Sequence, residues 1–312
     1  TDGGCVHHVT ARELLTGGFN VRNGNDWIFE DSTASDLGCQ DDLTPCEGLV
    51  RTPEYLTIPG VRSDGFGFYT ESATSRTVVR NSRAVRAVKY GIAAVFGAQG
   101  FHFHDNEVES GVGAGIACNG CNTGVIERNL VSSMHYPTGR NATWPNGFQG
   151  ELAQGVHCVG SVHDLSILQN VVSSGDGTGI RIFCSGPRLL VQDNAIVGNC
   201  RKYGESLQLG RTQGIQLLGN SVSDPGQGCQ FSVSVDSSRD VRIQGGRIES
   251  GLQTNVGLWL LGSPTYSTRN VVLRDLDIVG RSASGVGVQL DRASTATTLY
   301  DSVCVSGYPT AL

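Results

Sequence analysis

Five ionisable side chains between residues 157 and 203 have the types needed to move a proton next to a carboxylate. His157 and Arg181 occupy matching places in two similar segments, and Asp176, Lys202 and Tyr203 lie in polar stretches that precede such segments. A His, Lys or Tyr side chain can take a proton from carbon, and a guanidinium bound to the neighbouring carboxylate makes that proton more acidic. We therefore expect His157, Lys202 or Tyr203 to be the base and Arg181 the neutralising cation in a β-elimination.

Hydrolysis of a glycosidic bond would need two carboxyl groups that face the bond. Asp176, in the run Gly-Asp-Gly-Thr, is the best placed carboxylate because it comes just before the Arg181 segment. Asp2 and the adjacent pair Asp41 and Asp42 lie far from it in the sequence. The residues therefore favour a lyase or an epimerase over a glycoside hydrolase.

The two lysines of the chain each precede a Tyr-Gly pair, as Lys89-Tyr90 and Lys202-Tyr203. Together with Arg181 they would form a basic rim on an otherwise acidic protein. Such a rim attracts carboxylate or sulfate groups, which Arg binds in a bidentate manner. We expect Lys89 and Tyr90 to contact substrate, with chance placement of two lysines as the alternative.

A long polar stretch, from His135 to Gln154, comes directly before the His157 segment. It carries Tyr136, Arg140 and Trp144, and aromatic side chains offer flat apolar faces that suit sugar rings. Loops of this length in a compact fold are usually functional or disordered. We expect these three side chains to bind substrate; the alternative is a glycan-bearing loop, because Asn141-Ala-Thr is a glycosylation sequon.

The elements that position these residues repeat along the chain. An Asn, in most cases followed by a small or apolar residue and then an apolar one, recurs at separations of 25, 23, 41, 24 and 26 residues. The period is therefore about 24 residues, with one unit enlarged by about 17. The residues concerned are Asn81, Asn106, Asn129, Asn170, Asn194 and Asn220.

Each unit contains three short β-rich segments, and the third opens with Gly and an aliphatic residue. Segments of this kind stack on their neighbours at ~4.8 Å, and an Asn at one turn can bond to its counterpart in the next unit. One unit cannot bury its apolar side alone, so the units must stack. The sequence therefore predicts an all-β protein, a parallel β-helix of about nine coils with an Asn ladder.

Alternation along the Gly-aliphatic strands predicts which side chains face outward. Ile92, Ile116, Val156 and Ile180 should point into the core together with Ala94, Cys118, Cys158 and Ile182. The outward set changes from small to polar halfway along, and we expect Gln208 and Trp259 within it to contact substrate. This set is Ala93, Ala117, His157, Arg181, Gln208, Ser232, Trp259 and Gln289.

This pattern, over about residues 57–304, resembles the right-handed parallel β-helix superfamily of pectate lyases and polygalacturonases. The resemblance implies an Asn ladder between the second and third sheets. It also implies that the Gly-aliphatic strands form the first sheet, where such enzymes commonly place their active groove. The acidic Asn-Thr-Asp and Asp-Asp motifs of polygalacturonases are not met at the Asp176 coil, and no specific family is identified.

Residues 1–56 repeat less clearly than the rest. We expect irregular N-terminal coils and a disulfide loop from Cys39 to Cys46 over 1–56, then one continuous β-helix over 57–312. The ten cysteines lack paired zinc spacings, which favours disulfides in an exported protein, with buried free thiols as the alternative. An extracellular, cell-surface or periplasmic location follows.

The composition limits the partners. A net charge of −6 argues against general nucleic-acid binding, and no apolar run is long enough to span a bilayer. His104 could stack beside Glu127, but two ligands do not make a metal site. No metal site or certain cofactor is expected, calcium is one candidate, and self-association is left open.

These observations favour a secreted protein that acts on an extracellular, uronate-containing polysaccharide as a lyase or epimerase, in a groove on the first sheet. The alternative is a non-catalytic β-helix that serves as an adhesin, a surface fibre subunit or a carbohydrate-binding stalk. The fold alone does not decide between them, because it hosts both.

Overall fold

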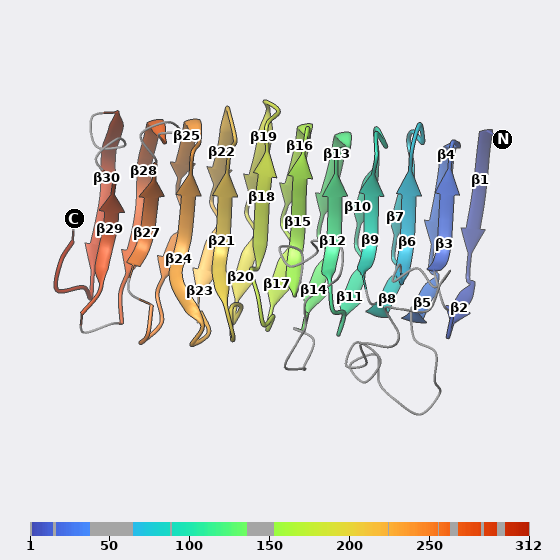
Figure 1. Ribbon diagram of the computed structural model, residues 1–312, viewed down its shortest axis with the longest axis horizontal. Helices are drawn as coiled ribbons and strands as arrows, with labels where there is room; N and C mark the ends of the chain where they lie inside the picture. The colour runs from blue at the N-terminus through green and yellow to red at the C-terminus, as the bar shows by residue number, and fades with distance from the viewer. Residues whose placement is uncertain are drawn as a thin grey trace, which may run out of the picture.

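The computed structural model describes residues 2–14, 17–37, 65–87, 89–135, 153–223, 225–254, 256–262, 268–281, 284–291 and 297–311. In these residues the chain is all-β and winds into one right-handed parallel β-helix, as the sequence predicts (Figure 1). The coils follow one another along a single axis, and the two ends of the chain lie at opposite ends of the stack. No helix in the described part of the chain is long and apolar enough to cross a membrane.

The first sheet is built from the Gly-aliphatic segments and contains ten strands, each paired in parallel with the next. Its strands are β3 (Gly17–Arg22), β6 (Phe66–Glu71), β9 (Tyr90–Val95), β12 (Ala114–Asn119), β15 (Gln154–Gly160), β18 (Ile180–Cys184), β21 (Gly204–Gly210), β24 (Cys229–Asp236), β27 (Val256–Leu261) and β29 (Val286–Leu290).

The second and third strands of each coil make the other two faces, which together form a 20-stranded sheet. The second face contains β1 (Asp2–His7), β4 (Asn25–Glu30), β7 (Val78–Arg80), β10 (His102–His104), β13 (Asn122–Glu127), β16 (His163–Leu168), β19 (Leu189–Gln192), β22 (Ile215–Leu218) and β25 (Arg239–Gln244). The third contains β2 (Thr10–Arg12), β5 (Thr33–Leu37), β8 (Arg83–Ala87), β11 (Glu107–Glu109), β14 (Leu130–Ser132), β17 (Val171–Ser173), β20 (Ala195–Val197), β23 (Ser221–Ser223) and β26 (Arg247–Glu249). Two longer strands, β28 (Arg269–Val279) and β30 (Thr298–Ser306), pair with strands of both faces or with each other.

The core is a stack of aliphatic side chains. Ile92, Ile116, Val156 and Ile180 follow one another in register and are fully buried, as predicted. Alternation explains this, because every second side chain of a strand points to the same face.

The Asn ladder lies between the second and third faces. The backbone N–H of Asn106 donates to Asn129 Oδ1 at 3.0 Å, and the N–H of Asn129 donates to Asn170 Oδ1 at 3.0 Å. The same bond links Asn170 to Asn194 and Asn194 to Asn220. Each rung satisfies a buried backbone donor at a corner where the coil makes no regular sheet bond.

The expectation that Asn81 belongs to this ladder is wrong. Asn81 is exposed with φ of 48°, and the ladder position is Ser82, whose backbone N–H donates to Asn106 Oδ1 at 3.0 Å. The residue before each rung adopts a left-handed conformation, which Asn tolerates. Two adjacent positions therefore both accept Asn, and sequence spacing alone does not separate them.

A column of glycines lines the start of the first sheet. A Cβ on Gly115 would lie 2.3 Å from Val131 Cγ1 and 2.8 Å from the Gly155 carbonyl oxygen, so only a hydrogen fits there. Gly91, Gly155 and Gly179 show the same close approach. At the start of the first sheet the backbone therefore lies against side chains of the third face, with no room for a Cβ between them.

Charged residues at the coil corners pair between consecutive coils. Arg128 bonds Asp105 at 2.9 Å, and Arg188 bonds Asp164 at 2.7 Å. All four residues have positive φ, and the two pairs lie at different corners of the coil. Each pair is exposed and contributes little to stability by itself.

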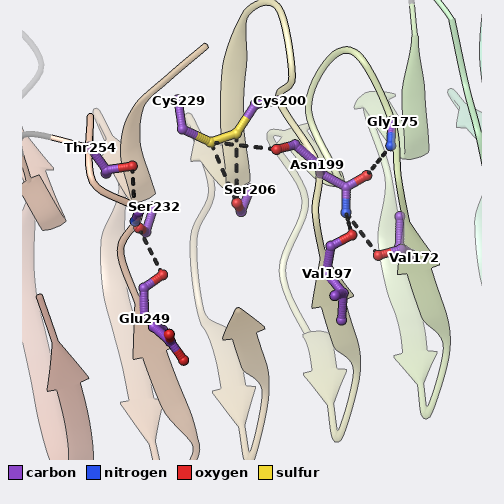
Figure 2. Close-up of a disulfide and its surroundings, with 11 residues drawn as sticks. Val172, Gly175, Val197, Asn199, Cys200, Ser206, Cys229, Ser232, Glu249 and Thr254 are labelled. Atoms are coloured by element: carbon purple, nitrogen blue, oxygen red, sulfur yellow. Dashed lines mark hydrogen bonds between the residues drawn. A yellow bond between two sulfur atoms is a disulfide. The ribbon is translucent and has the colours of Figure 1, made fainter. Parts of the chain in front are cut away.

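Two disulfides lie in the described residues. Cys118 pairs with Cys121 within one coil, and Cys200 pairs with Cys229 across successive coils. Figure 2 shows Cys200 and Cys229 beside Ser206, which takes the glycine position in β21 and whose Oγ lies 3.6 Å from Cys229 Sγ. The predicted disulfides are therefore present, whereas Cys39 and Cys46 lie outside the described residues.

Four other cysteines are free thiols. Cys158 and Cys184 are buried in the core, while Cys5 and Cys304 are exposed on β1 and β30. Disulfides and buried thiols, the two alternatives that the sequence raised, thus occur together.

The early coil is regular where it is described. In β3 and β6, Phe19 pairs with Phe68, and their rings stack at 4.9 Å. The predicted boundary between residues 56 and 57 lies outside the described residues and stays a prediction.

Candidate functional site

The outer face of the first sheet carries one column of side chains in register. Across β15, β18, β21, β24 and β27 the column is His157, Arg181, Gln208, Ser234 and Trp259. This is the outward set expected from alternation, with one correction. We call this set the outer column.

The correction concerns Ser232, which is fully buried and lies at the glycine position rather than in the outer column. The strand β24 has eight residues, and the register shifts between Gly204 and Glu205 of its neighbour β21. Because of that irregularity, Ser234 is the residue that pairs with Gln208.

The N-terminal part of the same face is apolar and buried. Ala93 and Ala117, which precede His157 in the outer column, are at most 1% exposed. Tyr90 is buried and stacks with Phe66, and Lys89 Nζ lies 5.3 Å from the Phe66 ring centroid. In this structure the Tyr90 ring therefore packs within the protein, and the Lys89 ammonium lies over the rings of Phe66 and Tyr90.

His157 is 1% exposed and its Nδ1 bonds to Gln154 Oε1. Burial, assisted by the charge of Arg181, lowers the pKa of the imidazole to about 3. The ring is therefore neutral at ordinary pH. In this conformation it is enclosed by the protein and does not face solvent.

Arg181 is partly exposed, and its guanidinium carbon lies 4.6 Å from the ring centroid of Phe183. The Phe183 ring occupies the space over Gly210, where a Cβ would come within 2.3 Å of it. Gly210 thus leaves room for the ring, and the ring supports the guanidinium by a cation–π contact.

The turns before the first sheet bring Asp176, Lys202 and His135 together. Lys202 Nζ lies 2.7 Å from Asp176 Oδ2, and His135 Nδ1 lies 3.8 Å from the same oxygen. The backbone N–H groups of Lys202 and Tyr203 both donate to the Asp176 carbonyl oxygen. Tyr203 is 56% exposed beside this cluster.

Glu205 is a titratable residue of this face that the sequence analysis did not select. Burial raises the pKa of its carboxyl to about 6, although the nearby Arg181 lowers it. Glu205 begins the pairing after the register shift in β21 and is opposite Phe231 in β24. Alternation did not select it, because a residue three positions from Gln208 falls on the opposite face of a regular strand.

Aromatic side chains lie at the C-terminal side of Arg181. The rings of Phe231 and Trp259 are 4.1 Å apart between centroids and both residues are partly exposed. Trp259 pairs with Ser234 on one side and Gln289 on the other. The outer face is therefore polar around Arg181 and aromatic three coils from it.

The remaining predicted residues Tyr136, Arg140 and Trp144 lie outside the described residues and stay predictions. Within the described residues no group of three or more His, Cys, Asp or Glu side chains is arranged to hold a metal ion. His104 does pair in register with Glu127, but the side chain that bonds Glu127, at 2.8 Å, is His102.

No family model and no curated protein matches this sequence. Among solved structures, the chain is similar to the A-module of the mannuronan C-5 epimerase AlgE6 of Azotobacter vinelandii, with a TM-score of 0.59 and 14% identity over 100% of this chain and 80% of that one. It is also similar to the periplasmic alginate epimerase AlgG (0.59, 11% identity, 95% and 76%). A third similar structure is the Dettilon tailspike protein (0.59, 10% identity, 96% and 62%).

These likenesses, at low identity, establish the shared parallel β-helix fold. The protein therefore belongs to the class of right-handed parallel β-helix proteins by structure, and no specific family is assigned by sequence.

Proposed function

We propose that the protein acts on an acidic, uronate-containing polysaccharide as a lyase or an epimerase, on the outer face of the first sheet. The observation that supports this most is the position of Arg181, which lies in register between His157 and Gln208 and close enough to Glu205 to lower its pKa. A cation beside a protonatable carboxyl supplies both requirements for removing a proton next to a carboxylate.

In the proposed reaction, Arg181 binds the uronate carboxylate while a base takes the proton from C5. In a lyase the electron pair of that C–H bond forms the C4–C5 double bond, the C4–oxygen bond breaks, and the leaving oxygen takes a proton. In an epimerase the C5 carbanion instead takes a proton on its opposite face. Arg181 lowers the barrier in both because it neutralises the negative charge that develops on the carboxylate.

Glu205 is the base that we propose in place of the three expected from the sequence. His157 is buried, and the Lys202 Nζ atom is occupied by an ion pair with Asp176 Oδ2 at 2.7 Å. A carboxyl with a pKa near 6 is close to the operating range of a general base. Tyr203 is exposed and is the proposed proton donor, with Asp176 and Lys202 positioning it through their turn.

The similar structures support an epimerase more than other polysaccharide chemistry. Two of them are described as epimerases of mannuronan or alginate, which are polyuronates. The two disulfides support an extracellular, cell-surface or periplasmic setting, because disulfides persist in oxidising compartments. Calcium is proposed as an optional cation, and chelation by EDTA would test it.

The experiment that tests the function is incubation with a panel of polyuronates in heavy water. Removal of the C5 proton leads to deuterium at C5 in an epimerase and to an unsaturated, ultraviolet-absorbing end in a lyase. Arg181→Ala is expected to lower either rate by about 10²–10³-fold. Arg188→Ala, which removes an exposed corner arginine, is the matched control and should leave the rate unchanged.

The proposed base has its own test. The wild-type rate should fall as the pH drops below about 6, because protonated Glu205 cannot accept a proton. Glu205→Gln should lose most of the rate at every pH, and Glu205→Asp should keep a measurable part of it. A Glu205→Gln variant with wild-type activity would exclude this role.

A non-catalytic role is the second candidate, and the ends of the stack favour it. Leu299 and Tyr300 on β30 are 68% and 40% exposed, and the end strands β1 and β30 have a free edge in the described residues. Such edges pair readily with other chains. Absence of exchange and elimination on every polymer, together with concentration-dependent association in sedimentation, would favour a fibre or binding protein.

A further inference from the structure

The spacing of the outer column matches the repeat of an extended sugar polymer. Arg181, Gln208, Ser234 and Trp259 follow one another in register on four consecutive strands of the first sheet. Neighbouring strands lie ~4.8 Å apart, so Trp259 is ~14 Å from Arg181 along the axis. One strand spacing is close to the length of one pyranose residue in an extended chain.

The free surface extends from Arg181 in one direction. Toward the N-terminus the column continues with His157, Ala117 and Ala93, each at most 1% exposed. Toward the C-terminus Gln208, Trp259 and Gln289 are partly exposed, while the small Ser234 between Gln208 and Trp259 is 2% exposed. The exposed side chains of the column therefore lie from Arg181 toward β27, and a polymer held at Arg181 finds its further contacts in that direction.

The far end of that path has the chemistry of a sugar-binding surface. Phe231 and Trp259 form a tilted aromatic pair, with an angle of 48° between the ring planes. Aromatic rings bind the apolar C–H faces of sugar rings, while indole N–H and hydroxyl groups bond to sugar hydroxyls. Among the described residues, the buried Ser234 Oγ and Trp259 Nε1 have no hydrogen-bond partner.

Unpaired buried polar atoms are uncommon in proteins and often mark a place where a ligand or water belongs. These two atoms sit on adjacent strands in register, and Trp259 is itself one ring of the aromatic pair. Both atoms are shielded from solvent, so a sugar hydroxyl would reach them only with a shift of the Trp259 ring.

We propose that an acidic polysaccharide lies along the helix axis over β18, β21, β24 and β27 with one sugar residue per coil, and that Phe231 and Trp259 bind the sugar three residues from the one held by Arg181. This inference rests on the proposed function, since it takes Arg181 as the site of the uronate carboxylate. It adds the direction in which the polysaccharide runs and a binding site for at least four sugar residues.

The test is binding of oligouronates from two to six residues long, measured by calorimetry on the whole chain. The wild-type affinity should rise on the order of tenfold between the trimer and the tetramer, because the fourth sugar gains an aromatic contact. Trp259→Ala should remove that step and leave the dimer affinity unchanged. Trp259→Phe should keep part of the step and shows whether the loss comes from the aromatic face.

Phe96→Ala is the matched control, because Phe96 is 67% exposed and lies outside the outer column. An affinity that levels off at the dimer, or a Trp259→Ala variant weakened equally at every length, overturns the subsite while the proposed function stands. No binding of any oligouronate, with no modification of any polyuronate, overturns both. Circular dichroism of each variant establishes that it is folded.

Discussion

At the scale of single residues, burial sets the chemistry of neighbouring groups on the outer face. The pKa of His157 is lowered to about 3 and that of Glu205 is raised to about 6. Both shifts favour the neutral form, because a group removed from water loses the solvation of its charge. Arg181 lowers the pKa of both groups, so it adds to the shift of His157 and opposes that of Glu205.

His157 should make the protein sensitive to acid. Its folded pKa lies below the ordinary value of 6.5, so the unfolded chain binds the proton first as the pH falls. Stability is therefore full above pH 6.5 and is lost toward pH 3, by about 1.4 kcal/mol for each pH unit. In His157→Gln the denaturation midpoint should change less with pH over this range than it does in the wild type.

His163→Gln is the control for that measurement, because His163 is 39% exposed and bonds to Asp164 on the surface. It should keep the wild-type dependence on pH. A His157→Gln protein that follows the wild-type curve would show that the ring already takes a proton in the folded state.

At the scale of the elements, two stacked sets of residues position the strands, one by hydrogen bonding and the other by close packing. The Asn ladder supplies hydrogen bonds at one corner, and the glycine column gives room at another. Neither column is continuous: Ser82 replaces Asn at one rung, and Ser206 replaces Gly beside the disulfide. The coil geometry therefore tolerates a small polar side chain at both places, whereas it excludes a bulky one.

The ladder predicts a contrast between two asparagines. Asn129→Ala should lower the free energy of unfolding by about 3 kcal/mol, because it leaves the Asn106 N–H and the Phe103 carbonyl without their side-chain partner. Asn81→Ala should cost about 1 kcal/mol, since Asn81 is exposed outside the ladder and loses only the tolerance of Asn for its φ of 48°. Denaturant titration of both variants checks this, and equal losses would contradict the register.

The glycine column predicts a second contrast. In Gly155→Ala the new Cβ would lie 2.1 Å from Val172 Cγ1, within packed core, and we expect a loss of about 3 kcal/mol or more. Gly120→Ala meets no atom within 4 Å and carries only the strain of φ +61°, about 1–2 kcal/mol. Melting curves of both variants would rank the two losses of stability. If Gly155→Ala lost less stability than Gly120→Ala, the coil would be able to widen around the new Cβ.

At the scale of the whole molecule, stability is a sum over neighbouring coils, because each coil contacts the ones before and after it. The Cys200–Cys229 disulfide joins successive coils over a sequence separation of 29 residues. It therefore keeps these two segments close together in the unfolded chain as well as in the folded protein.

The cysteines predict a labelling pattern for the intact protein. Burial raises the pKa of Cys184 to about 12 and that of Cys158 well above its usual value, so neither forms the reactive thiolate. Iodoacetamide at pH 8 should modify Cys5 and Cys304 and spare Cys158 and Cys184 until the chain is denatured. Peptide mapping by mass spectrometry reads this out, and early labelling of Cys158 would indicate an open core.

Much of the fold could be predicted from local pattern. Alternation placed Ile116 and Val156 inside and Arg181 and Gln208 outside, because each β-strand has a side-chain period of two. Spacing located the rungs from Asn106 to Asn220, since a stacked coil repeats its corner at a constant length. These features depend on one coil and its nearest neighbour, and a single sequence contains that information.

What only the tertiary structure decided was register and burial. Ser234, two residues beyond the expected Ser232, pairs with Gln208, and Ser82 holds the ladder position expected for the adjacent Asn81. His157 and Arg181 have the same alternation and the same coil position, yet one is buried and the other is partly exposed. Solvent access depends on side chains from distant parts of the chain, so the sequence could name the ionisable groups, whereas the folded structure decided which of them face water.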